Sequence, residues 1–152
     1  MGFLDSIDIS ASGLTAQRLR MDTIASNMAN VETTRVQNGN GPYRRQVVIF
    51  EARAPKTNRK SFSNILQDNL EMLGTGVRVK EIRQLSDNEA PFRRVYNPSH
   101  PDADQDGYVN YPNVNIVEEM INMISATRAY EANAKVIESS KSMAMRALNI
   151  GK

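Results

Sequence analysis

Apolar residues recur at alternating steps of four and three along the C-terminal part of the chain. The steps land on Ile116, Met120, Met123, Thr127, Tyr130, Ala134, Ile137, Lys141, Ala144 and Leu148. This alternation is typical of a helix that packs lengthwise against another helix. Asn115 and Glu118 can form a capping box at its start, and Gly151 is a residue type that commonly ends a helix. We predict one helix from about Asn113 to Gly151, roughly 50 Å long at about 1.5 Å per residue.

The N-terminal part of the chain carries the same spacing. Its positions are Leu4, Ile7, Ala11, Leu14, Arg18, Met21, Ala25 and Met28, and only Arg18 is not apolar. The long stem of an arginine can lie along an apolar stripe while its charge reaches water. Gly13 disfavours a helix unless close packing requires it, so we expect a neighbour there. The pattern predicts two terminal helices paired as an antiparallel coiled coil.

The apolar stripe of the C-terminal helix is wider than one partner helix needs. Val117, Ile121 and Ile124 extend it beyond two heptad positions, which is typical of a helix with several neighbours. A core helix of an all-α bundle would need several partner helices, and this chain offers only one good candidate. We expect contacts between helices and between subunits to involve Leu4, Ile7, Ala11, Leu14, Met21, Met28, Ile116, Val117, Met120, Ile121, Met123, Ile124, Tyr130, Ala134, Ile137 and Leu148.

Between the helices the pattern changes to short β-type segments and loops. Strands are predicted at Tyr43–Phe50 and Val77–Lys80, a turn at Ser86–Glu89, a hairpin segment at Phe92–Tyr96, a short helix at Phe62–Leu73 and irregular loops at Arg53–Lys60 and Asn97–Pro112. The predicted fold class is therefore mainly α with a small β-rich insert. We divide the chain into an N-terminal helix (1–34), a β-rich middle domain with a β-hairpin (35–111) and a C-terminal helix (112–152).

Composition narrows the function classes. The chain has 152 residues, a net charge of +2 and no cysteine, so disulfides are excluded. Its apolar runs are too short for a membrane span, and Met1–Asp5 lacks the basic start of a secretory signal. We expect no direct membrane insertion and no cleaved signal peptide. The basic run from Arg44 to Lys60 has too few aromatic residues for a nucleic-acid stacking platform, so we expect no nucleic-acid partner.

Candidate chemistry is sparse. Asp102, Asp104, Asp106 and Gly107 fit the first half of an EF-hand loop, but Asn113 stands at the twelfth position, where a glutamate should close the cage. A plain acidic turn is the favoured interpretation, and calcium binding stays a third-ranked alternative. His100 is the only histidine, so no Ser-His-Asp, Cys-His or zinc constellation can be assembled. We predict no catalytic, cofactor-binding or metal-binding residues, and a protein that is not an enzyme.

Both terminal segments resemble bacterial flagellar rod and hook proteins. The N-terminal resemblance runs through Ala11–Asp22 and Ala25–Thr34, and the C-terminal one through Pro112–Asn115, Met120–Ala126 and Arg128–Asn133. Within the family, the short middle with Asn97–Pro98, His100–Asp104 and Gly107–Val109 is most similar to a proximal rod protein. Glu32 departs from the pattern, because many axial proteins carry Asn at this place.

The resemblance implies a structural role. Rod proteins pair their terminal helices in a coiled-coil inner domain, carry a β-rich domain outside it, and polymerise with themselves and other rod proteins into a hollow, torque-transmitting shaft. The resemblance also implies export through the flagellar type III apparatus without a cleaved signal, and assembly in the periplasmic part of the basal body. An alternative from another class is a coiled-coil adaptor or export-linked interaction module that never polymerises.

Overall fold

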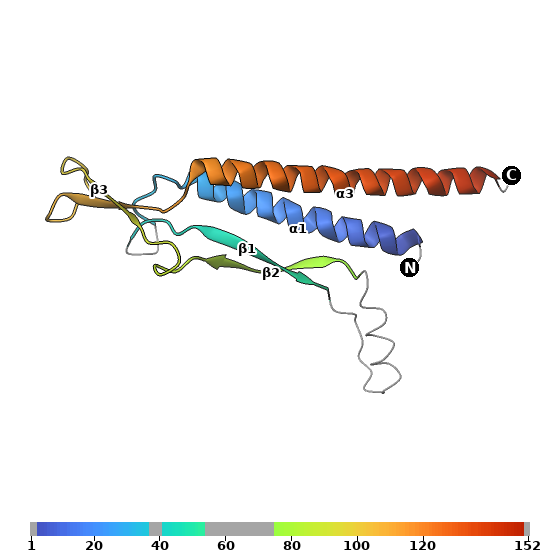
Figure 1. The fold of residues 1–152 in the computed structure, drawn as a ribbon, viewed down its shortest axis with the longest axis horizontal. Helices are drawn as coiled ribbons and strands as arrows, with labels where there is room; N and C mark the ends of the chain where they lie inside the picture. Colours follow the sequence, from blue (N-terminus) through green and yellow to red (C-terminus); the bar gives the residue numbers. More distant parts are fainter. Residues whose placement is uncertain (1–2, 37–40, 54–74, 151–152) are drawn as a thin grey trace, which may run out of the picture. The chain divides into compact units, whose positions relative to one another are not determined.

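Two long helices and four short strands make up the described part of the chain. The computed structural model describes residues 3–36, 41–53 and 75–150. In chain order the elements are α1 (Phe3–Ala29), β1 (Gln46–Ala52), β2 (Val77–Gln84), β3 (Arg93–Tyr96), β4 (Tyr108–Tyr111) and α3 (Ile116–Ile150), as Figure 1 shows. A mainly helical fold with a small β insert is confirmed. The predicted helix Phe62–Leu73 and residues 54–60 of the basic loop lie outside the described residues.

Polar residues at the helix ends set their limits. Asn115 is the N-cap of α3: its Oδ1 accepts a hydrogen bond from the backbone N–H of Val117 at 3.0 Å, and its carbonyl accepts from the N–H of Glu119 at 3.0 Å. At the end of α1, both the backbone N–H and the Nδ2 group of Asn30 donate to the carbonyl of Ser26. Such bonds satisfy backbone groups that have no partner within the helix.

The strands form two separate pairs. β1 and β2 make a two-stranded sheet, in which Arg45 bonds to Leu85 at one end and Arg53 to Gly76 at the other, so the strands are antiparallel. β3 and β4 are also antiparallel, with Arg93 opposite Tyr111. The prediction of an irregular loop throughout Asn97–Pro112 was wrong for Tyr108–Tyr111. The β-forming residues Tyr108, Val109 and Tyr111 are a strand signal that the surrounding Pro, Asp and Gly outweighed.

The chain divides into two compact units. The first comprises Met1–Leu19, Phe50–Lys80 and Thr127–Lys152, and the second comprises Arg20–Ile49 and Glu81–Ala126. In the first unit the Ser12 hydroxyl donates to the carbonyl of Ile9 at 2.6 Å and accepts from the N–H of Val77 at 3.0 Å. In the second unit the α1 and α3 segments are antiparallel, since Arg20 bonds to Asn122 and Asn27 to Glu119. The division into 1–34, 35–111 and 112–152 stays a prediction.

The buried positions of the helices differ by one residue from the heptad positions read from the sequence. In α1 the buried residues include Ser10, Gly13, Ile24 and Asn27, whereas Arg18 and Ala25 are exposed. In α3 the buried residues recur at sevens as Glu119, Ala126 and Ser140, with Asn133 half-buried between them, whereas Thr127 is half-buried and Met120, Ala134 and Lys141 are exposed. The course of the Arg18 stem stays a prediction, because an exposed arginine is also what that prediction expects. The one-residue difference arises because small and polar side chains occupy the buried positions, and apolar residues lie beside them.

Candidate functional site

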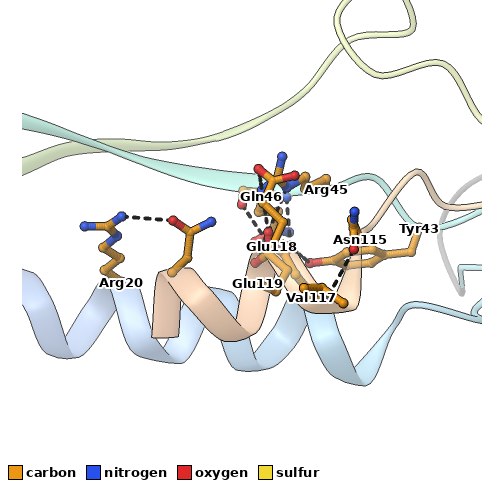
Figure 2. Close-up of polar contacts among 10 residues, drawn as sticks. Arg20, Tyr43, Arg45, Gln46, Asn115, Val117, Glu118 and Glu119 are labelled. Atoms are coloured by element: carbon orange, nitrogen blue, oxygen red, sulfur yellow. Dashed lines mark hydrogen bonds and ion pairs between the residues drawn. The ribbon is translucent and has the colours of Figure 1, made fainter. Parts of the chain in front are cut away.

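A cluster of polar residues lies in the second unit, where the end of α1, the segment before β1 and the start of α3 meet, and Asn27, Tyr43 and Glu119 are buried within it. We call Asn27, Tyr43, Arg45, Gln46, Glu118 and Glu119 the polar cluster; Figure 2 shows Arg45 and Gln46 beside Glu118 and Glu119. Asn27 is only 1% exposed and Glu119 only 2%. Charged side chains are rarely buried to this degree unless they are paired.

Every hydrogen-bonding position of the Asn27 carboxamide is occupied. Its Oδ1 accepts from the hydroxyl of Tyr43 at 2.9 Å and from the backbone N–H of Gln46 at 2.9 Å. Its Nδ2 donates to the carbonyl of Gln46 at 2.8 Å and to Oε2 of Glu119 at 3.1 Å. The side chain therefore pairs with both backbone groups of Gln46, as a neighbouring strand would, and fixes the first residue of β1 to α1.

The Glu119 carboxylate forms an ion pair with Arg45 of the same chain. Its Oε1 accepts from Nε of Arg45 at 2.9 Å and also from the Nη2 group, while Oε2 is held by Asn27. The same Arg45 Nη2 group donates to Glu118 at 2.8 Å. Burial alone lowers the pKa of Arg45, but its hydrogen bonds and charge interactions with Glu119 and Glu118 outweigh this, so the pKa is raised above its ordinary value. The guanidinium therefore stays charged beside the two carboxylates.

The first three turns of α3 carry an apolar face that the chain leaves uncovered. We call this set the exposed apolar face: Ile116, Val117, Met120, Ile121 and Ile124. All five are exposed, with Val117 at 59% and Ile121 at 63%. Large side chains of this kind clustered on one helix face are typical of a contact surface for another protein. In the first unit, Val136, Met143, Met145 and Leu148 of α3 are exposed as well.

The predicted contact residues fall into three groups. Ile7, Ala11, Leu14, Met21, Met28, Met123, Tyr130 and Ile137 are half-buried. Ile116, Val117, Met120, Ile121, Ile124, Ala134 and Leu148 are exposed. Leu4 lies in α1, and its side chain is outside the described ones. The structure brings the exposed apolar face together near the start of α3, while the part that each residue plays in contacts between subunits stays a prediction.

The Asp102–Gly107 turn is held by contacts with its own chain. The Asp102 carboxylate accepts a hydrogen bond from the Thr34 hydroxyl at 2.8 Å and forms an ion pair with Arg35. Asp104 lies 3.6 Å from Arg94 in an exposed ion pair. His100 accepts through Nδ1 from the backbone N–H of Asp102 at 3.1 Å. Within residues 3–36, 41–53 and 75–150, no group of three or more acidic or histidine side chains is arranged to hold a metal ion.

Sequence reasoning missed the polar cluster. Neither Asn27 nor Glu119 lies at one of the apolar heptad positions, so the spacing does not single them out. A signal was present: Gly13, Arg20 and Asn27 recur at sevens in α1, as Glu119, Ala126, Asn133 and Ser140 do in α3. A repeat of small and polar residues beside an apolar repeat indicates a helix with two different contact faces.

Of the helices described, none is long and apolar enough to cross a membrane.

Comparison with known proteins gives consistent matches. Residues 7–37 match the family described as flagella basal body rod protein, and residues 105–150 match the flagellar basal body rod FlgEFG protein C-terminal family. The chain is 50% identical to the flagellar basal-body rod protein FlgC of Borreliella burgdorferi, over 99% of this chain and 98% of that protein. It is 41% identical to FlgC of Bacillus subtilis, over 97% of each. For FlgC of Salmonella typhimurium the identity is 36% over 99% of each.

Proposed function

Because the chain belongs to the FlgC family of flagellar basal-body rod proteins, we propose that it polymerises through its terminal helices into the proximal part of the rod. In this role it is a structural subunit of a hollow shaft that transmits torque. It acts by forming contacts rather than by catalysis. Its partners are further copies of itself and other rod proteins.

The observation that carries this proposal is the exposed apolar face of α3. Five large aliphatic side chains within three helical turns remain open to water, although the same helix buries Glu119 and Ala126. A chain that served only as a compact monomer would gain by burying them. Unlike patches that join head to tail without closing a ring generate a helical tube, which is the geometry of a shaft.

The pairing of α1 with α3 supports the same role. Within the second unit the two helix segments are antiparallel, and within the first unit Gly13 lies against Asn133. We propose that these contacts belong to one continuous antiparallel coiled coil, whose outer surface packs on neighbouring subunits. We further propose export by the flagellar type III apparatus without a cleaved signal, followed by assembly in the periplasm.

The test compares an exposed with a buried isoleucine. Ile121→Ser removes an apolar side chain that is 63% exposed, so the free energy of unfolding of the monomer should change by less than about 0.5 kcal/mol. Rod assembly and motility should be lost when this variant replaces the chromosomal copy. Ile24→Ser is the control: Ile24 is buried, so the monomer itself should be strongly destabilised.

Sedimentation separates the proposal from its alternative. Mixed with other purified rod proteins, the unmodified chain should form particles that Ile121→Ser does not form. A non-polymerising adaptor would instead give complexes of fixed size that are insensitive to subunit concentration. Normal motility with Ile121→Ser at ordinary protein levels would contradict the assignment of the exposed apolar face to assembly.

A further inference from the structure

We infer that the polar cluster sets the rotation of α3 about its own axis against α1 in the second unit, so that the exposed apolar face points away from the chain's own core. This role goes beyond holding the fold together. It rests on the proposed function only for the identity of the neighbours that the face contacts. The rotation itself is a property of the single chain.

Helix geometry shows that the two faces are separate. Successive residues of an α-helix are turned by about 100°, so Val117 and Ile121 each lie about 160° from Glu119 around the axis. Ala126 lies only about 20° from Glu119 and is fully buried. The start of α3 therefore has a polar and small face turned inward and an aliphatic face turned outward.

Apolar burial alone favours a different rotation. Suppose that α3 were turned about its own axis by less than about 100°, in the direction that brings Ile116 and Met120 toward α1. Ala126 would then move toward water. This is the arrangement that the heptad pattern of the sequence predicts, and it would bury more aliphatic surface. Something other than hydrophobic burial must hold the observed rotation.

The polar cluster supplies that restraint. A turn of this size would carry the Glu119 carboxylate away from Arg45 and Asn27. Asn27 could not follow it, because its Oδ1 is held by the backbone N–H of Gln46 and by the hydroxyl of Tyr43. A buried charge without its partner costs more than an aliphatic side chain left in water. Single buried polar residues select the register of helix pairs in the same way, at a cost in stability.

A simpler role would be to anchor the first residue of β1. That role needs only Asn27 and the backbone of Gln46. An anchoring role does not require the Arg45–Glu119 pair. It predicts no change in the rotation of α3 when the pair is replaced. The two roles can therefore be separated by measuring which side of α3 is accessible.

The chain has no cysteine, so single cysteines can report on each side of α3. Met120→Cys probes a side chain that is 43% exposed, and Ala126→Cys a position that is 0% exposed. In the full-length monomer, thiol alkylation should be at least about 10-fold faster at position 120 than at position 126. Each probe is then combined with Asn27→Leu, Arg45→Met and Glu119→Leu, a set that replaces the cluster with aliphatic side chains of similar size.

The inference expects the ratio of the two alkylation rates to fall at least 10-fold, and to approach reversal, in the triple variant. An unchanged ratio in a variant with native helical circular dichroism would overturn it. If the triple variant unfolds, both sites react rapidly, and Glu119→Gln decides instead: it removes the charge and keeps the volume, and a ratio unchanged from the parent overturns the inference. Altered rotation with normal rod assembly would argue against the proposed function and leave the inference standing.

Discussion

Nδ2 of Asn27 donates a hydrogen bond to Oε2 of Glu119 over 3.1 Å, although the two residues are 92 positions apart in the sequence. This bond joins the last turns of α1 to the first turns of α3, and both side chains are almost fully buried. Such a buried hydrogen bond matters to stability mainly because removing one partner leaves the other buried without a hydrogen bond, which costs free energy. The two residues therefore tie together the segments that present the exposed apolar face.

Asn27→Ala should destabilise the monomer by about 2–4 kcal/mol, because it leaves the Glu119 carboxylate, the Tyr43 hydroxyl and the backbone of Gln46 with unmade bonds. Urea unfolding followed by circular dichroism measures this loss. Asn122→Ala is the matched control, since Asn122 is half-buried and accepts one long hydrogen bond, at 3.4 Å from Arg20. Its cost should stay below about 1 kcal/mol. Equal losses in the two variants would show that the occupied carboxamide of Asn27 is not what matters.

Ala126→Leu should destabilise the monomer by about 1–3 kcal/mol, because Ala126 is fully buried and the added atoms must displace their neighbours. Ala134→Leu places the same substitution on the same helix at an exposed position. It should change the free energy of unfolding by less than about 0.5 kcal/mol. Both values come from denaturant titration of the purified chain. A larger loss at position 134 than at position 126 would mean that the heptad positions read from the sequence are the buried ones after all.

Hydrophobic periodicity was enough to predict the two helices and the β insert, because helix and strand formation depends on local pattern and capping. Asn115 shows this: its cap was readable from its place before the apolar run, and the structure contains the bond to Val117. The rotation of the helices was not readable from apolar residues. It depends on which residues find partners across the fold, as Glu119 does with Arg45 in a segment 74 positions away. The spacing rule assumed that the most apolar face is buried within the chain.

The carboxyl group of Glu89 should titrate below its ordinary pKa. The largest cause is the hydrogen bond from the backbone N–H of Ser86, followed by the side chains of Arg83 and Ser86. Because the pKa is lowered in the folded chain, the stabilisation is present above the ordinary value of about 4.3 and is lost as the pH falls through the folded value. An NMR titration of the side-chain carboxyl carbon gives the midpoint.

Arg83→Gln tests the order of these causes. The midpoint of Glu89 should rise only part of the way to the ordinary value, because the backbone N–H of Ser86 still donates to the carboxylate. Complete return to the ordinary pKa would identify Arg83 as the dominant cause and contradict this ranking.

Gly76→Ala should destabilise the first unit. Gly76 has a φ of 90°, and a Cβ atom there would lie 2.5 Å from Oγ of Ser12, the hydroxyl that accepts from Val77. The substitution must break that bond or move the turn before β2, on top of the backbone strain of about 1 kcal/mol or more. Gly41→Ala is the control, because φ is also positive there but, among the described residues and apart from its chain neighbours, no atom lies within 4 Å of the added carbon. Thermal unfolding should show a clearly larger loss at position 76, and equal losses would mean that the contact with Ser12 adds nothing.

Amide hydrogen exchange should show which part of α3 is less stable in the monomer, before neighbouring subunits bind. The last turns of α3 bury few side chains: Ser140 is buried, whereas Met143, Met145 and Leu148 are exposed. The turns around Glu119 are held by the polar cluster and by Ala126. Amides of 141–149 should therefore exchange at least about 10-fold faster than those of 119–126 in the monomer, because local opening exposes less apolar surface there. Mass spectrometry of peptic fragments measures both segments at once. In assembled rods the difference should shrink, since neighbouring subunits cover the exposed residues of α3. Equal and slow exchange of both segments in the monomer would contradict the prediction that the end of α3 is its less stable part.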